Sequence, residues 1–351
     1  MKKIGIVTLT RVFNAGNSLQ NYAVQQIYRK MGFDPETLIY IQENYKKRVK
    51  RYVKYLVNCK SDAGKEFQRR KRFIEFESQF IKTSPFKNMW SHSENAEKRY
   101  DYYSLGSDQV WNPTWYNDKT KHLFMLDFTI PQKKICFSPS IGLDKLPDEW
   151  IDFFILGLSS FPHISVRERT AAKLVYELTG KDAEVLIDPT LMLSKSDWID
   201  IENKPDIPIK DNAYVYEYFL GDSPKRIEDD ENIIVEKSGI DKIIRYNDIK
   251  WKVGPREFIY LIHHASFILT DSFHGSVFSF IFDIPFAVYN RNGSDEMYSR
   301  IADFLKLFSI KKHEFSEDQI YRRSKSKLQK SILINEQARV WDFLLNSFSN
   351  G

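Results

Sequence analysis

Apolar and polar positions alternate along the first forty residues in the order expected of a doubly wound α/β fold. The continuous apolar and β-branched run at residues 3–9 predicts a buried parallel strand. Apolar residues at helical spacing over 18–31 predict a helix that ends at Gly32, and residues 37–41 predict the next strand. Strand, loop, helix and strand in this order form the βαβ unit of a parallel sheet.

The same alternation of strands and helices continues to the C-terminus. Further strands are predicted at residues 101–105, 134–139, 163–166, 185–187, 213–219, 242–246, 266–270 and 285–289. Helices are predicted at residues 66–80, 148–157, 170–178, 255–265, 276–282, 297–307 and 335–348. This pattern predicts an α/β protein with parallel sheets and a C-terminal helix that closes the structure. We expect one domain at 1–155 and a second at 156–351.

Length and composition narrow the class of protein. The chain has 351 residues, more than a single core usually holds, which favours two domains. Its two cysteines, Cys59 and Cys136, exclude a disulfide scaffold and most zinc sites, and we expect no bound metal. No apolar run approaches the length needed to span a bilayer, so we expect a cytoplasmic protein.

The net charge of +5 is an average over two different regions. Residues 46–72 hold twelve Lys and Arg against Asp62 and Glu66, a net charge of +10, and the remaining chain carries −5. We interpret residues 43–83 as a basic helical insertion in the first domain. Two interpretations of its charge are open: a solvated helical face, or a peripheral contact with anionic lipid at the inner face of the membrane. No nucleic-acid-reading element accompanies the patch, so nucleic acid is not an expected partner.

The strongest local signal for chemistry lies at residues 270–276, where a predicted strand runs into a polar turn that opens a helix. Strand ends and helix N-termini of this kind favour an anion, phosphate above all. His274 suits proton transfer near neutral pH. A capped helix in which His274 is only a structural hydrogen-bonding residue is the open alternative. The expected substrate-binding residues of this turn are Asp271, Ser272, Gly275 and Ser276.

Three further polar turns carry candidate residues. Arg167 follows a predicted strand and can offer two parallel donors to a carboxylate or phosphate, or can form a salt bridge. Asp108 can accept a hydrogen bond from a hydroxyl. Trp111 can stack on a sugar face, or can be a buried residue of its turn. The other candidates at these turns are Ser107, Asn17 and Gln20.

Taken in order, these segments resemble the polysaccharide pyruvyl transferase family. The matching stretches are 5–9, 17–23, 106–112, 138–142, 165–168, 188–191 and 270–275. They span nearly the whole chain. The resemblance implies two Rossmann-like domains facing a cleft that holds the site, similar to the GT-B glycosyltransferases. It implies no cofactor.

The resemblance also implies a reaction. The enolpyruvyl group of phosphoenolpyruvate moves onto hydroxyls of a sugar in a surface polysaccharide or its lipid-linked precursor, forming a pyruvate ketal and releasing phosphate. The expected partners are phosphoenolpyruvate and a sugar acceptor, such as a lipid-linked oligosaccharide. Two alternatives are a GT-B-type glycosyltransferase that uses a sugar nucleotide, and a non-catalytic carbohydrate- or phosphate-binding protein.

In that reaction we expect Arg167 to hold the donor's carboxylate or phosphate and the turn at 272–276 to hold its phosphate. We expect His274 to act as general acid–base and Asp108 to orient an acceptor hydroxyl. The chain departs from the family in one respect. Better-known members carry an arginine two residues before the histidine that matches His274, where this chain has Ser272.

Overall fold

The computed structural model describes residues 1–10, 12–40, 62–86, 99–115, 121–224, 227–291, 299–310 and 325–349. The chain forms two compact units. The first comprises residues 1–50, 77–192 and 334–351, and the second comprises residues 51–76 and 193–333. Each unit has its own sheet of parallel strands, so the expected α/β class is confirmed.

The division into units differs from the one expected from the sequence, which cuts the chain after residue 155. Residues 156–192 group with the first unit because they pack around its core, where Val166 shares one buried cluster with Trp111. The C-terminal residues 334–351 also group with the first unit. A pattern of strands and helices shows the alternation of elements, but not which core each element joins.

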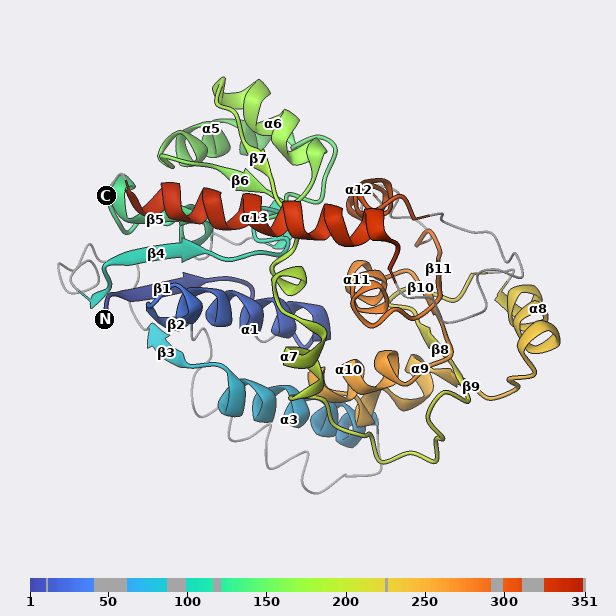
Figure 1. Ribbon diagram of the computed structural model, residues 1–351. Coiled ribbons are helices and arrows are strands. Elements are labelled where there is room, and N and C mark those ends of the chain that lie inside the picture. The colour runs from blue at the N-terminus through green and yellow to red at the C-terminus, as the bar shows by residue number, and fades with distance from the viewer. Residues whose placement is uncertain are drawn as a thin grey trace. The chain divides into compact units, whose positions relative to one another are not determined.

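The first unit is built on a five-stranded parallel sheet with the order β3-β2-β1-β4-β5 (Figure 1). The strands are β1 (Lys3–Val7), β2 (Asp34–Tyr40), β3 (Thr83–Phe86), β4 (Tyr102–Leu105) and β5 (Lys134–Cys136). Four of them coincide with predicted strands. β3 was not predicted because of Pro85, a residue that strands accept at the edge of a sheet, which is where β3 lies.

Helix α1 (Ala15–Lys30) connects β1 to β2. It begins three residues before the predicted start because the Asn14 side chain caps it, accepting a hydrogen bond from the Asn17 backbone N–H at 3.3 Å. The helix ends at Met31, and Gly32 follows with a φ of 84°, the left-handed conformation that glycine adopts without strain.

A smaller group of elements completes the first unit. Helices α5 (Ile151–Ser159) and α6 (Arg169–Thr179) pack side by side (Figure 1). Beside them, β6 (Ser165–Val166) and β7 (Glu184–Val185) form a two-stranded parallel sheet. The end of β6 delivers Arg167 to the first polar cluster described below.

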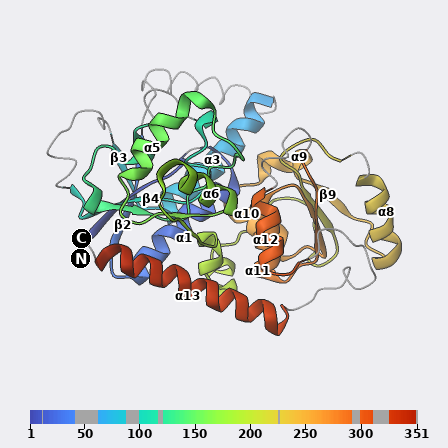
Figure 2. The ribbon, with the colours of Figure 1, turned by 90° about the horizontal axis from the view of Figure 1, so that it is seen from above.

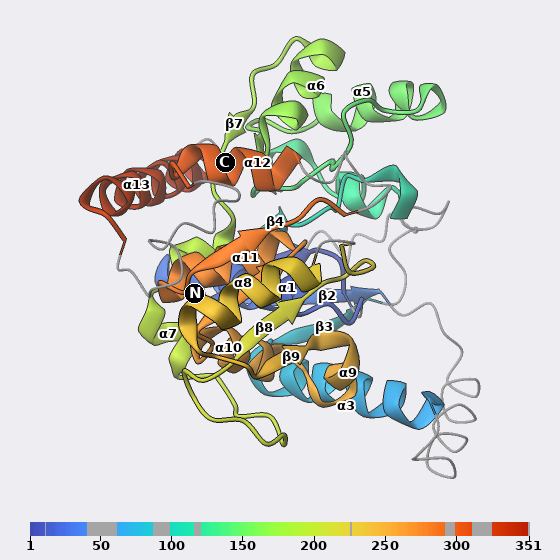
Figure 3. The same cartoon turned by 90° about the vertical axis from the view of Figure 1, so that its right-hand side faces the viewer.

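The second unit has a four-stranded parallel sheet with the order β11-β10-β8-β9. Its strands are β8 (Val215–Tyr218), β9 (Ile243–Arg245), β10 (Phe267–Thr270) and β11 (Phe286–Val288). Figure 3 shows β8 and β9 with α9, which follows β9 directly.

Helices α9 (Tyr246–Ile249) and α11 (Phe273–Phe282) contact the sheet of the second unit. The unit also contains α7 (Lys195–Ile199), α8 (Ile227–Ser238), α10 (Pro255–His263) and α12 (Ser299–Leu307). Helix α11 packs against α10 and lies beside α12 (Figure 2). Its apolar residues are all buried, because the helix is surrounded by these neighbours and by β10.

Two long helices have residues in both units. They are α3 (Asp62–Phe80) and α13 (Lys327–Ser349), which begins eight residues before the predicted closing helix. The predicted basic insertion falls partly on α3, whose residues to Phe76 group with the second unit, and residues 46–61 lie outside the described residues. In the described parts of the chain, no helix has the length and apolar character needed to cross a membrane.

Candidate functional site

The first polar cluster lies in the first unit, where Asp108 follows β4 and Arg167 follows β6. The Arg167 guanidinium lies between two carboxylates. Its Nη1 donates to Asp188 Oδ2 at 2.6 Å, and its Nη2 donates to Asp108 Oδ1 at 3.3 Å. Burial by itself lowers the pKa of Arg167, but the neighbouring carboxylates outweigh burial and raise it above its usual value. The side chain is only 1% exposed, so it is a fixed internal cation.

The salt-bridge interpretation of Arg167 is therefore the one that the structure shows.

The next residue, Glu168, adds a third buried carboxylate. Its Oε1 accepts hydrogen bonds from Ser140 Oγ at 3.0 Å and from the backbone N–H groups of Ile141 and Gly142 at 2.9 and 3.1 Å. One guanidinium among three carboxylates makes the cluster net negative, which disfavours a strongly anionic ligand.

Asp108 is the carboxylate of this cluster that reaches solvent, with its side chain 14% exposed. It accepts hydrogen bonds from Asn17 Nδ2 at 3.2 Å and from Arg167. Its backbone has a φ of 76°, in the left-handed region that aspartate tolerates better than most residues. A carboxylate that is held in place and keeps part of its surface in solvent can accept a hydrogen bond or a proton from a ligand hydroxyl.

Three residues expected to bind substrate here are buried in structural contacts. Trp111 is fully buried, and its Nε1 donates to the backbone carbonyl of Phe124 at 3.0 Å, so the indole cannot stack on a sugar. This corrects the expectation: the turn folds the indole into the core. Gln20 is fully buried and donates to Thr8 Oγ1 at 3.0 Å. The Ser107 hydroxyl is buried beside the guanidinium described above.

The second polar cluster lies in the second unit, where β10 leads into α11. The Ser272 hydroxyl caps α11, accepting a hydrogen bond from the Gly275 N–H at 3.3 Å. The buried Ser276 hydroxyl donates to the Ser272 carbonyl at 3.1 Å. Both hydroxyls therefore serve the helix cap, as the capped-helix alternative predicts. The turn still presents the positive end of the α11 dipole, which attracts anions.

Asp271 organises the loops around this turn. Its Oδ1 accepts from the Leu220 N–H at 2.8 Å, and its Oδ2 accepts from the Gly221 N–H at 2.9 Å and from Arg291 Nε at 2.8 Å. Arg291 thus brings a partly exposed cation to the turn. Arg291 was not predicted from the sequence, because it follows β11 and only the parallel pairing of β10 with β11 brings the two strand ends together.

His274 is the second residue of α11 and is mostly buried, with its ring edge-on to Phe273 at 5.2 Å between centroids. It lies one turn from the Asp271–Arg291 ion pair along the chain. Its role as general acid–base stays a prediction.

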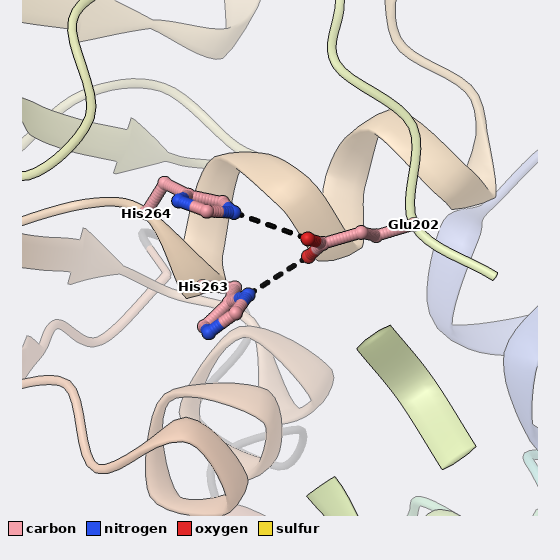
Figure 4. Close-up of side chains that lie close together, drawn as sticks. All are labelled: Glu202, His263 and His264. Carbon is pink, nitrogen blue, oxygen red and sulfur yellow. Dashed lines mark hydrogen bonds and ion pairs between the residues drawn. The ribbon is translucent and has the colours of Figure 1, made fainter. Parts of the chain in front are cut away.

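Metal-ligating side chains also come together in the second unit, although the sequence led us to expect no metal. Glu202, His263 and His264 form the group of three found among the described residues (Figure 4). They come from the loop after α7 and from the end of α10, not from either polar cluster.

Comparison with known protein families identifies the family of this chain. The family described as "Polysaccharide pyruvyl transferase" matches residues 14–293, a span that includes both polar clusters. The chain belongs to the polysaccharide pyruvyl transferase family. The resemblance carried by the ordered motifs is therefore confirmed. No curated protein sequence matches the chain significantly.

Solved structures of low sequence identity share the fold. The UDP-GlcNAc 2-epimerase from Neisseria meningitidis, bound to UDP-GlcNAc, covers 99% of this chain and 100% of its own, with a TM-score of 0.50 and 13% identity. A TarM mutant from S. aureus, in complex with Fondaparinux, alpha-GlcNAc-glycerol and UDP, covers 99% and 100%, with a TM-score of 0.50 and 9% identity. These similarities show the fold alone, and they confirm the expected GT-B-like class.

Proposed function

We propose that this polysaccharide pyruvyl transferase moves the enolpyruvyl group of phosphoenolpyruvate onto hydroxyls of a sugar, forming a pyruvate ketal. The sugar belongs to a surface polysaccharide or to its lipid-linked precursor. The observation that carries the proposal is the family match over residues 14–293. The two polar clusters support it, because each follows the carboxyl end of a parallel strand, where ligands of open α/β sheets bind.

The donor phosphate is assigned to the turn before α11. This turn combines a helix N-terminus with the partly exposed cation Arg291. Arg291 compensates for the serine at position 272, where better-known members of the family carry arginine. Charge that develops on the leaving phosphate is stabilised by such fixed donors.

The acceptor hydroxyl is assigned to Asp108. The cluster around it is net negative, which suits a neutral sugar better than phosphoenolpyruvate. Arg167 then acts as a positioning residue that holds Asp108 and Asp188, and not as a ligand of the donor.

His274 delivers a proton to the methylene carbon of phosphoenolpyruvate while one sugar hydroxyl bonds to the carbon that bears the phosphate and gives up its proton to Asp108. Phosphate leaves with its bonding electron pair. A second hydroxyl of the sugar bonds to the same carbon and gives its proton to the departing phosphate, which closes the ketal.

To test this proposal, the protein is incubated with phosphoenolpyruvate and a panel of galactosides, glucosides and mannosides. The release of inorganic phosphate is then measured. The proposal predicts release that depends on one acceptor and falls by about 10²- to 10⁴-fold in His274→Ala and in Asp108→Asn. His122→Ala, a change at an exposed histidine, is the matched control and should release phosphate normally. Transfer from a UDP-sugar, or binding without any product, would overturn the proposal.

A further inference from the structure

Two consecutive histidines and one glutamate converge in the second unit (Figure 4). Glu202 Oε2 lies 2.8 Å from His263 Nδ1, and its Oε1 lies 3.1 Å from His264 Nε2. One ligand atom from each of the three residues lies within 4.8 Å of the others. All three side chains are partly exposed, so an ion from solution can reach them.

From this geometry we propose that Glu202, His263 and His264 bind a divalent transition-metal ion, with Zn²⁺ as the best-fitting occupant. Two imidazole nitrogens and one carboxylate oxygen form a ligand set that zinc sites use, with water in the fourth position. Imidazole ligands also favour Zn²⁺ over Mg²⁺ or Ca²⁺, which take oxygen ligands.

The ligand atoms lie near the spacing that such an ion requires. Ligands about 2.0–2.1 Å from a tetrahedral Zn²⁺ are about 3.3 Å from one another. The two nitrogen–oxygen separations of 2.8 and 3.1 Å, each to a different oxygen of Glu202, are a few tenths of an ångström shorter than this value. One ligand atom of each residue lies within 4.8 Å of the others, so binding requires the side chains to draw together around the ion.

A second carboxylate orients one of the ligands. Asp211 Oδ2 lies 3.4 Å from His264 Nδ1, the ring nitrogen that does not face Glu202. The Tyr260 hydroxyl in turn donates to Asp211 Oδ1 at 2.6 Å, and the Tyr260 ring stacks on His264. A carboxylate on the outer nitrogen of a histidine ligand fixes the tautomer and strengthens its bond to the metal.

The backbone that carries Glu202 is fixed to α10. Arg256 Nε donates to the Ile201 carbonyl at 2.9 Å, and the Asn203 N–H donates to the Arg256 carbonyl at 3.2 Å. The Asn203 side chain donates to Glu257 at 2.9 Å. The carboxylate therefore faces the histidines without further ordering of the chain, which reduces the entropy lost on binding.

The position of the histidines on their helix favours a cation. His263 and His264 lie at the C-terminal end of α10, the negative end of the helix dipole.

The test is a titration of the full-length protein, without an affinity tag of histidines, after treatment with a chelator. Co²⁺ serves as the spectroscopic probe and Zn²⁺ as the competitor. The proposal predicts the visible absorption of four-coordinate Co²⁺, one ion per chain, and loss of that absorption when Zn²⁺ is added. An absorption spectrum equal to that of aqueous Co²⁺ would overturn the proposal.

Variants locate the ion. Glu202→Gln and His264→Ala should abolish the Co²⁺ absorption, and Asp211→Asn should weaken Zn²⁺ binding by about 10- to 100-fold. His163→Ala and His122→Ala are matched controls away from the cluster and should bind as the wild type does. Circular dichroism confirms that each variant is folded. A folded Glu202→Gln protein that binds Zn²⁺ with wild-type affinity would contradict the assignment.

Discussion

At the scale of single residues, two arginines serve the two polar clusters in different ways. Arg167 is buried between Asp108 and Asp188 and satisfies their charges. Arg291 is partly exposed and uses only its Nε toward Asp271 in the contacts described. The first arginine holds a carboxylate in place, whereas the second contacts the turn before α11, to which we assign the donor phosphate.

Replacing Arg167 by methionine should destabilise the protein strongly. The change leaves Asp188, which has no exposed side-chain area, buried without its cation. Removing one partner of a buried ion pair lowers the free energy of unfolding by about 3–5 kcal/mol. Arg339→Met is the matched control, since Arg339 pairs with Glu336 at an exposed position and should lose no more than about 1 kcal/mol. Urea unfolding measures both, and equal losses would refute a special role for the buried pair.

Gly275 permits α11 to approach β10 closely. A Cβ at this position would lie 2.5 Å from Thr270 Oγ1 and 3.2 Å from Thr270 Cβ. Gly275→Ala should therefore lower the free energy of unfolding by about 1–3 kcal/mol. The same change in a Thr270→Ala background should be less damaging, because the Oγ1 atom that would lie 2.5 Å away is gone. Additive effects in this double-mutant cycle would argue against the clash.

Candidate residues could be identified from the sequence where they come shortly after a predicted strand. Asp108, Asp271 and His274 were found from their positions after predicted strands. The two interpretations of Trp111 could not be separated from the sequence, because its burial depends on a contact with Phe124, more than ten residues along the chain. Arg291 and the pairing of Glu202 with two histidines depend on contacts between segments distant in the chain.

At the scale of elements, the strands and helices with a clear apolar period were predicted and those without it were missed. The sequence of α8, Ile227–Ser238, begins with four acidic or polar residues out of five and gives a weak apolar pattern. In β3, Pro85 interrupts the strand pattern. The order of the strands within each sheet could not be derived from the sequence, because it depends on pairing across long stretches of chain.

One strand carries a carboxyl group that makes stability depend on pH. Glu217 lies in β8, and burial together with a hydrogen bond and repulsion from Glu231 raises its pKa from 4.5 to about 8, despite attraction by Arg245. The folded protein therefore keeps a proton that the unfolded chain loses. This group stabilises the fold at acid pH, and its contribution disappears as the pH rises through about 8.

Glu217→Gln should flatten this dependence, because glutamine keeps a donor toward Glu231 at every pH. We expect the free energy of unfolding of the wild type to fall more steeply than that of the variant between pH 4.5 and about 8. Urea unfolding across that range measures the two slopes. Parallel curves would show that Glu217 does not hold its proton in the folded state.

At the scale of the whole molecule, the chain combines two parallel-sheet units with one strongly basic stretch. In the described part of that stretch, Arg70 pairs with Glu66 and Arg72 pairs with Glu257. These two arginines therefore form ion pairs within the folded chain. For the charges at 46–61, we propose the second of the two interpretations given above, a contact with anionic lipid head groups.

Neutralising two lysines of this stretch should weaken binding to vesicles. Each basic residue near an anionic surface contributes about 1 kcal/mol, so Lys46→Gln with Lys47→Gln should lower the affinity by roughly 30-fold. Lys145→Gln with Lys173→Gln changes the charge equally at exposed positions elsewhere and is the matched control. Co-sedimentation with vesicles containing phosphatidylserine, at low and high salt, measures the effect. Equal sedimentation of both variants, unaffected by salt, would contradict the proposed lipid contact.

The most direct test of the account is the mass of the product formed in heavy water. The protein is incubated in D₂O with phosphoenolpyruvate and the acceptor that supports phosphate release, and the sugar product is analysed by mass spectrometry. Enolpyruvyl transfer predicts a pyruvate ketal with one carbon-bound deuterium, since the methylene carbon gains its new hydrogen from solvent. A ketal without that deuterium, or a product that carries a glycosyl group, would contradict the proposed reaction.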